Sequence, residues 1–174
     1  MAFLFTDAQR LAEPLAAMQR LPAGSGVVLR QYGSPGREAL AQTMVHLARR
    51  HGLCLLLAGD GAMAQRLGAD GLHLPENLLR RALWRPETAA AHGAAAIVAA
   101  WRAGAGAVFI SPVFATASHP GAPGLGMLRF AVLLRLARRY GLKVYALGGI
   151  DSRAQRRLAP LKPDGYGGIG RYLG

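Results

Sequence analysis

Residues 107–126 of the chain read AVFISPVFATASHPGAPGLG, and the fold class can be worked out from this stretch. Its first four residues are apolar, which is typical of a strand buried in a parallel sheet. A long loop follows, in which Thr116, Ser118 and His119 lie among prolines and glycines that fix an unusual backbone path. In α/β proteins, ligands usually bind where such a strand ends in a polar loop. The stretch therefore predicts a ligand-binding loop, with an ordinary surface loop as the alternative.

A local pattern of helix, glycine and apolar strand recurs along the chain. Strands that alternate with helices predict βαβ units and a parallel sheet. The pattern appears in HGLCLLL from His51, LGADGLHL from Leu67, AGAGAVFI from Ala103 and YGLKVYAL from Tyr140.

The number of expected strands favours a closed (β/α)8 TIM barrel over an open, doubly wound sheet. The chain has 174 residues, and such barrels typically need about 200 or more. We therefore expect one compact barrel domain over residues 1–174, with shortened helices and a missing or truncated last helix. Strands are predicted at 3–5, 26–29, 53–58, 71–74, 88–91, 107–110, 144–147 and 165–169, and helices at 8–20, 36–51, 62–67, 94–103, 127–140 and 152–158, with a further short helix after residue 77.

The amino-acid composition limits which classes of ligand the protein is expected to bind and in which cellular compartment it is expected to work. The formal net charge is +12, but the arginines are scattered in pairs without interleaved aromatic residues, so we expect small anionic ligands rather than nucleic acid. No apolar run approaches the roughly 20 residues of a membrane span, and the start of the chain lacks the basic region of a secretory signal. Cys54 is the only cysteine, which excludes intrachain disulfides and cysteine-based zinc sites. We expect a cytoplasmic protein that binds a phosphorylated small molecule.

The lysines bear on the class of chemistry. Schiff-base catalysis requires a lysine amine, and the chain has only Lys143 and Lys162. Both precede or begin predicted strands, at the end of the sheet opposite the expected ligand-binding face. Lysine-dependent aldolase chemistry is therefore not expected.

Several of the nine carboxylates fall where catalytic groups of a barrel lie, at the ends of strands. These are Asp7, Asp60, Glu76 and Asp151. Asp60 is the candidate magnesium ligand, because magnesium binds carboxylate oxygens and often shares them with substrate phosphates. The alternative role for Asp60 is to cap the helix that follows it, and Asp7 and Asp151 are expected to cap helices.

Two glycine-rich loops follow the last two predicted strands. They contain Gly148 and Gly149 in one loop, and Gly167, Gly168 and Gly170 in the other. Backbone amides in such loops can bind a phosphate, and barrels often bind phosphate after strands seven and eight.

Other polar residues near strand ends have less specific interpretations. Arg30 is a candidate for binding a second anion, with a surface arginine as the alternative. His119 lies in the long loop, where it is either functional or exposed. His73 is expected to be a core histidine with a hydrogen-bond partner, and His92 to belong to a turn.

The chain resembles the thiamine phosphate synthase family, which includes the thiazole tautomerases. The matching motifs are FLFTD at the start, VVLRQY, ADGLHL, PVFATASH, ALGGID and DGYGGIG, in the family's order and spacing across nearly the whole chain. The resemblance implies a (β/α)8 barrel. It also implies a transferase that uses magnesium to join an aminopyrimidine methyl diphosphate to a hydroxyethylthiazole phosphate, with release of pyrophosphate.

The resemblance also implies roles for individual residues. Arg30 matches the arginine that binds pyrophosphate, and Asp60 a magnesium-binding aspartate. Thr116 and Ser118 match the hydroxyl residues of the phosphate-binding loop, and Gly149 and the Gly170 amide match the thiazole phosphate site. Arg30 and His119 are the candidate catalytic residues, and His119 stands in place of the loop lysine.

The chain departs from the family pattern mainly in the diphosphate half of the site. Apolar or uncharged residues replace a glutamine, a lysine, an asparagine, a second metal aspartate and a serine. In that order they are Val28, Tyr32, Gly59, Leu78 and Ala90, while Pro112 replaces the loop histidine of the tautomerases. Two classes of hypothesis remain. The first is a thiamine-pathway enzyme with a remodelled diphosphate site and reduced activity; the alternative is a non-catalytic relative that binds a phosphate ligand, or a thiazole tautomerase-like protein.

Overall fold

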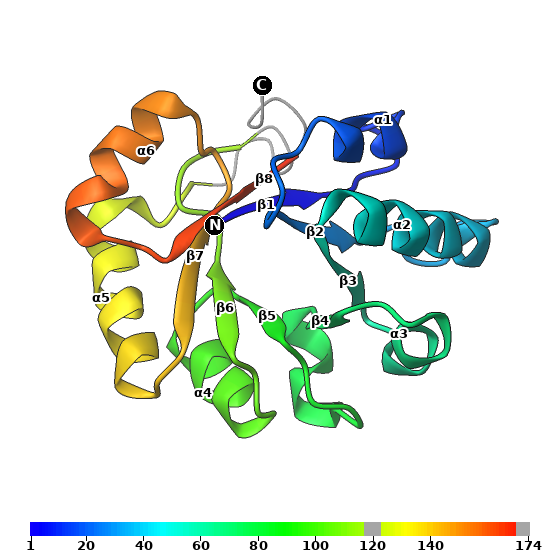
Figure 1. Ribbon diagram of the computed structural model, residues 1–174. Coiled ribbons are helices and arrows are strands. Elements are labelled where there is room, and N and C mark those ends of the chain that lie inside the picture. The colour runs from blue at the N-terminus through cyan, green and yellow to red at the C-terminus, as the bar shows by residue number, and fades with distance from the viewer. Residues whose placement is uncertain (117–122, 170–174) are drawn as a thin grey trace.

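The computed structural model describes residues 1–116 and 123–169, and its strands form a closed parallel barrel (Figure 1). Each strand pairs with the next along the chain, and β8 pairs with β1, which confirms the barrel and excludes the open sheet. The strands are β1 (Ala2–Phe5), β2 (Gly26–Leu29), β3 (Cys54–Ala58), β4 (Gly71–Leu74), β5 (Thr88–Ala91), β6 (Ala107–Ile110), β7 (Lys143–Leu147) and β8 (Gly165–Gly168).

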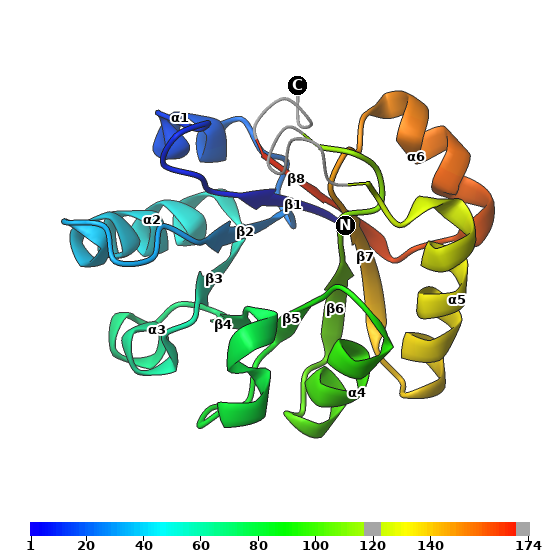
Figure 2. The same cartoon turned by 180° about the vertical axis from the view of Figure 1, so that it is seen from behind.

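Helices surround the barrel on its outside, as Figure 2 shows from the opposite side. The predicted shortening is confirmed, because several helices have only two turns. They are α1 (Pro14–Gln19), α2 (Arg37–His51), α3 (Gly61–Leu67), α4 (Ala94–Arg102), α5 (Gly126–Arg139) and α6 (Ser152–Leu158), with 3₁₀ helices η1 (Glu76–Arg81) and η2 (Ala159–Leu161). Within the described residues no helix follows β8, and none is long and apolar enough to cross a membrane.

Three local predictions were wrong in detail. The first helix starts at Pro14 instead of Ala8, and Asp7 does not cap it as predicted. Asp7 instead accepts hydrogen bonds from the N–H groups of Gln9 and Arg10 and thereby forms a turn before the helix. Proline suits the first helical position, where its missing N–H is not needed. The segment after β4 is a 3₁₀ helix. By contrast, Asp151 caps α6 as predicted, since its carboxylate accepts from the N–H of Ala154.

Aromatic rings fill the interior of the barrel. The ring of Phe109 lies 4.8 Å from that of Phe5 and 5.0 Å from that of Phe3, both edge to face, and 5.1 Å from that of Tyr145. Edge-to-face contacts at these separations are favourable beyond the area that they bury. The barrel is therefore a packed core, and a ligand can enter only at its ends.

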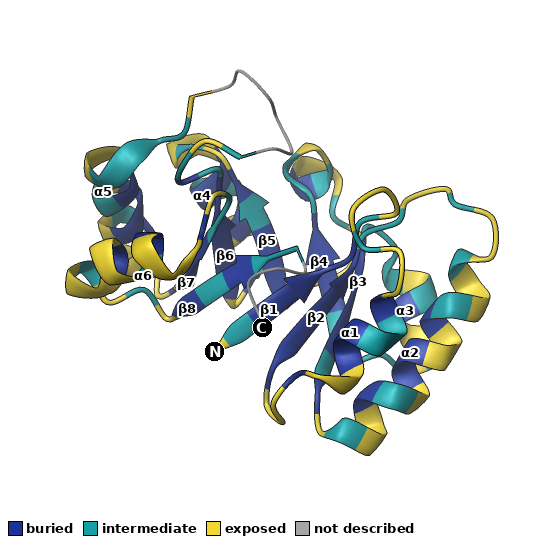
Figure 3. Ribbon diagram, turned by 90° about the horizontal axis from the view of Figure 1, so that it is seen from above, coloured by how far each residue is buried: buried dark blue, intermediate teal, exposed yellow. Residues whose placement is uncertain are grey.

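Small side chains let the short helices lie close to the strands. Ala41 and Ala48 of α2 and Ala96 and Ala100 of α4 are fully or almost fully buried against the sheet. Figure 3 shows the resulting layers, with buried strands inside and exposed residues on the outer faces of the helices. Close approach of helix to sheet explains how a chain of this length completes a barrel.

Carboxylates fix the N-terminal end of the barrel. Asp70 accepts from the N–H of Leu55 at 2.7 Å, and Asp164 accepts from the N–H of Val144 at 2.8 Å. Each thus joins the start of one strand to its neighbour. Groups at this end of a barrel serve stability, so the functional site is expected at the opposite end.

Candidate active site

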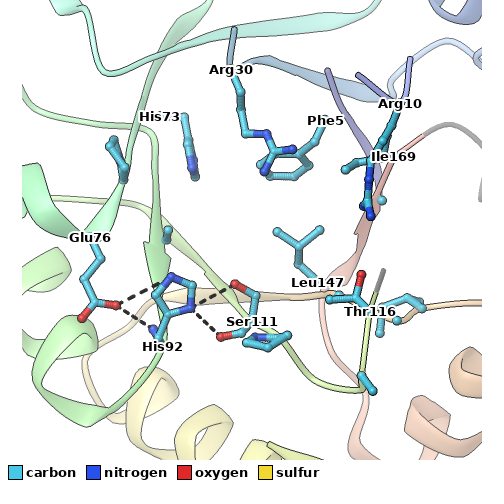
Figure 4. A pocket seen from close by; sticks show the side chains of 18 of the residues that line it. Phe5, Arg10, Arg30, His73, Glu76, His92, Ser111, Thr116, Leu147 and Ile169 are labelled. Carbon is cyan, nitrogen blue, oxygen red and sulfur yellow. Dashed lines mark hydrogen bonds and ion pairs between the residues drawn. The ribbon is translucent and has the colours of Figure 1, made fainter. Parts of the chain in front are cut away.

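A cavity of about 970 Å³ opens at the C-terminal ends of the strands (Figure 4). Because all eight strands are parallel, their C-terminal ends meet here and bring distant parts of the chain together. Residues at or just after strands contribute most of the lining, among them Phe5, Arg30, His73, Ala90, His92, Ser111, Leu147, Gly149 and Ile169.

One wall of the cavity is formed by the loop after β7 and the loop after β6. Gly148 and Gly149 have φ values of +90° and +65°, a backbone conformation that suits glycine. A Cβ atom at Gly149 would lie 2.6 Å from the carbonyl oxygen of Ala115, so the loops can pack this closely only with glycine. The N–H of Phe114 donates to the Gly148 carbonyl at 3.1 Å. This packing places Thr116 and Gly149 on the same cavity.

Arg30 forms part of the opposite wall and is already held in place by protein groups. Its Nε donates to the Thr6 carbonyl at 3.1 Å, and its Nη2 lies 3.1 Å from the Asp7 carboxylate. Its guanidinium also lies 5.5 Å from the centre of the Phe5 ring. Burial lowers the pKa of Arg30, and the charge of Asp7 opposes that effect. A fixed guanidinium on the cavity is suited to binding an anion, although Asp7 neutralises part of its charge.

Asp60 does not line this cavity. One of its carboxylate oxygens accepts from the N–H of Met63 at 2.8 Å and caps α3, which was the alternative role. Its other oxygen lies 3.9 Å from Nη1 of Arg37. Within the described residues, no group of three or more histidine, cysteine or acidic side chains is placed to hold a metal ion. The residues around Asp60 therefore fit a magnesium ion poorly.

Apolar groups surround Gly59, next to Asp60. A Cβ atom at Gly59 would lie 3.1 Å from the Tyr32 ring and 3.6 Å from the Leu78 side chain. Arg37 lies 5.9 Å from the centre of the Tyr32 ring and donates to the Ala58 carbonyl at 2.6 Å. Burial raises the pKa of Tyr32, so its hydroxyl stays neutral near pH 7. Arg37 is a residue that the sequence did not single out, because its partner Asp60 lies in a distant loop.

His73 is a structural residue at the floor of the cavity. Its Nδ1 lies 2.9 Å from the Thr88 hydroxyl, and its ring packs edge to face against Phe5. Burial, with a smaller effect from the charge of Arg30, lowers its pKa from the ordinary 6.5 to about 3. The prediction of a core histidine with a hydrogen-bond partner is confirmed.

We expect His73 to make the protein less stable in mild acid. Between about pH 3 and 6.5 the unfolded chain protonates this ring and the folded chain does not, so the free energy of unfolding falls as pH falls. At about 1.4 kcal/mol per pH unit, this contributes a loss of about 2 kcal/mol at pH 5. His73→Asn preserves a partner for Thr88 but does not titrate. Denaturant unfolding at pH 7 and pH 5 should show the smaller loss for the variant, and equal losses would contradict the assignment.

His92 lines the cavity as part of a cluster that the sequence did not reveal. The His92 ring nitrogen Nδ1 lies 2.6 Å from the Ser111 carbonyl oxygen. The backbone N–H of His92 donates to the Glu76 carboxylate at 2.9 Å (Figure 4). Its predicted place in a turn is compatible with the structure, since it follows β5. The position of His92 just after a strand was the sequence signal that could have marked it as a site residue. Its contact with Ser111 could not be predicted, because that contact depends on the pairing of β5 with β6.

Three of the predicted site residues, Ser118, His119 and Gly170, lie outside the described residues. Their roles stay predictions. Of the other predicted site residues, Arg30, Thr116 and Gly149 come together on one cavity, and Asp60 lies apart from it.

A family model and individual relatives of known description indicate the same protein family. Residues 3–166 match the family described as thiamine monophosphate synthase. The chain is similar to the thiamine-phosphate synthase of Thermus thermophilus, with 36% identity over 121 residues, which is 65% of this chain and 56% of that protein. It is 31% identical over 172 residues to the thiamine-phosphate synthase of a Mycobacterium species, covering 86% of this chain and 74% of that one.

A solved structure agrees in fold. The thiamine phosphate pyrophosphorylase of Pyrococcus furiosus superposes with a TM-score of 0.79 at 21% identity, covering 99% of this chain and 87% of that one. The match to the Thermus relative spans little more than half of that protein's length. The extent of the family match, over most of the chain, nevertheless shows that this protein belongs to the thiamine monophosphate synthase family.

Proposed function

We propose that this protein is a transferase of thiamine biosynthesis that binds hydroxyethylthiazole phosphate and couples it, slowly, to aminopyrimidine methyl diphosphate. The observation that carries the proposal is the cavity that has Gly149 and Thr116 on one wall and Arg30 on the other. Two phosphorylated substrates need two places for anions, and these walls offer one each. We place this activity in the cytoplasm, with small phosphorylated molecules and no nucleic acid or membrane as partners.

The thiazole phosphate half of the site relies on backbone and hydroxyl groups. Gly149 and Thr116 line the cavity, and the tight packing of their loops holds them in position. The predicted contributions of Ser118 and Gly170 belong to the same half. Backbone amides do not change when side chains diverge, so we propose that binding of the thiazole phosphate persists in this chain.

The diphosphate half relies on side chains and is reduced. Arg30 is present, but Tyr32 and Leu78 pack around Gly59 where the resemblance implies polar groups. Val28 is fully buried and adds no polar group to this half. A leaving pyrophosphate needs its developing charge stabilised in place, and the loss of polar partners weakens that stabilisation. We therefore propose a reduced rate of coupling.

The described side chains around Asp60 do not provide a full set of oxygen ligands for a magnesium ion. The Asp60 carboxylate caps α3 and faces Arg37, and Leu78 replaces the second carboxylate that the resemblance implies. Magnesium requires several oxygen ligands in near-octahedral geometry. We propose that this chain does not assemble a magnesium site without ligand, and that the thiazole phosphate binds independently of the metal.

The apolar packing around Gly59 also favours a second candidate function, that of a non-catalytic relative which binds a phosphate ligand. Tyr32 and Leu78 occupy space next to Gly59 that a bulkier polar residue there would need. The two candidates differ in one respect, because only the first forms thiamine phosphate. Assay of product separates them.

A thermal-shift experiment tests the proposal and its magnesium component together. At a concentration about 100 times its dissociation constant, thiazole phosphate should stabilise the folded protein by about 2.7 kcal/mol. For a chain of this size that corresponds to a rise in Tm of about 5–10 °C. We expect the same rise with magnesium and with a chelator, and no shift from magnesium alone. A shift that requires magnesium would contradict the proposal, and no shift in either condition would exclude the thiazole phosphate as a ligand.

A further inference from the structure

His92, Glu76 and Ser111 line the same cavity but are not among the residues proposed above to bind the two phosphorylated groups. His92 is about half exposed at the cavity, with 54% of its side chain accessible, so a ligand can reach it. Figure 4 shows its ring on the side of the cavity opposite Arg30. A bound molecule that contacts Arg30 at one end can therefore approach His92 with another part.

The hydrogen bonds of His92 fix which ring nitrogen carries the proton. A carbonyl oxygen only accepts hydrogen bonds, so the contact of 2.6 Å with the Ser111 carbonyl places the proton of the neutral ring on Nδ1. Nε2 then has a lone pair. The nearest oxygen of Glu76 lies 4.0 Å from Nε2, which is too far for a hydrogen bond and leaves that lone pair unoccupied by Glu76. His92 Nε2 is thus arranged to accept a proton from a ligand in the cavity.

The coupling reaction has a step that such a base assists. Pyrophosphate leaves from a methylene carbon attached to an aminopyrimidine ring. If the ring's amino group loses a proton, its electron pair can move through the ring and expel the leaving group. A base positioned at that amino group lowers the barrier without stabilising the pyrophosphate itself.

We propose that His92 Nε2 is the general base that accepts the amino proton of the aminopyrimidine substrate; this inference rests on the proposed function. The N–H electron pair forms a C=N bond, the ring electrons shift, and the methylene C–O bond breaks, with its electron pair leaving on pyrophosphate. The thiazole nitrogen then bonds to the methylene carbon. The ring electrons return to the amino nitrogen, which regains the proton from His92. The products are thiamine phosphate and pyrophosphate, with no other reactant consumed.

This assignment places two groups on opposite sides of one substrate. Arg30 lies where the diphosphate leaves, and His92 lies where the electron pair that expels it originates. The Ser111 carbonyl keeps Nε2 free to accept the proton. The base thereby offsets part of the electrostatic stabilisation lost with the polar partners of the diphosphate.

His92→Asn is a sharp test, because the side-chain amide nitrogen of asparagine corresponds to Nδ1 and can still donate to the Ser111 carbonyl. The variant lacks a base at Nε2. We expect release of pyrophosphate and formation of thiamine phosphate to fall by about 10²-fold or more. Affinity for thiazole phosphate, measured by calorimetry, should not change. His46→Asn, on the exposed face of α2, is the matched control and should leave both rates at the wild-type level.

The possible outcomes separate this inference from the proposed function. Equal rates for the wild type and His92→Asn would overturn the role of His92 and leave the coupling activity intact. A wild-type protein that releases no pyrophosphate from the aminopyrimidine substrate would overturn both. His92→Gln, which places an amide nitrogen near Nε2, should be as slow as His92→Asn, and full activity in that variant would show that a hydrogen-bond donor suffices.

Discussion

The purified protein should form thiamine phosphate at least about 10³-fold more slowly than the roughly 1 per second or more that is usual for enzymes. The reason is the diphosphate half of the cavity. Tyr32 and Leu78 pack around Gly59, and Asp60 is engaged in capping α3. Each lost charge-assisted contact is worth about 1.5–3 kcal/mol, so three or four such losses suffice for this deficit even if they are far from additive.

The assay is direct and has a natural reference. Both precursors, magnesium and protein are incubated, and thiamine phosphate is quantified by chromatography, with the Thermus thermophilus thiamine-phosphate synthase in parallel. The double variant Tyr32→Lys, Leu78→Asp restores a cation and a carboxylate, and it should raise the rate of this protein by about tenfold or more. Wild-type turnover near 1 per second would show that other residues stabilise the leaving pyrophosphate.

Replacing Gly149 with alanine should weaken binding of thiazole phosphate by about 10²-fold or more, equivalent to about 2.7 kcal/mol. The added Cβ would lie 2.6 Å from the Ala115 carbonyl oxygen, and that atom belongs to the backbone, so the loop bearing Thr116 must shift. The positive φ of +65° adds strain of about 1–2 kcal/mol. Calorimetry of the wild type and the variant measures the difference in affinity.

Gly141→Ala is the matched control for this substitution. Gly141 has a φ of +72°, but a Cβ atom there would meet nothing within 4 Å. The control therefore imposes similar backbone strain at a position next to α5 and away from the cavity lining. It should lower stability by about 1–2 kcal/mol and leave affinity unchanged. If both variants bind as the wild type does, the packing of the loop at Gly149 does not hold the ligand.

Most of the fold was predictable because its signals are local. Each strand is a short run of four or five residues. Several strands are preceded by a glycine that ends a helix, such as Gly52 and Gly68, and both of these glycines have left-handed φ values. Even β5, with the sequence TAAA, was recognisable from its place in the alternation of strands and helices. The start of α1 was not, because the turn at Asp7 competes with the helical spacing of the apolar residues.

The site was predictable only where the strand ends alone determine it. Arg30 directly follows β2, Gly149 lies in the loop after β7, and both line the cavity. Asp60 also follows a strand, but its own helix and Arg37 occupy its carboxylate. The role of His92 depends on Ser111, which is 19 residues away and is brought close by strand pairing. Such contacts between loops cannot be read from spacing along the chain.

The central claim is that thiazole phosphate binds in this cavity with its phosphate against the loop that contains Gly149. A crystal structure of the protein soaked with hydroxyethylthiazole phosphate, without magnesium, tests it most directly. We predict density for the phosphate within hydrogen-bond distance of the Gly149 backbone and Thr116, with the ring toward Leu147. A phosphate bound elsewhere, or a cavity that stays empty at saturating ligand, would contradict the account.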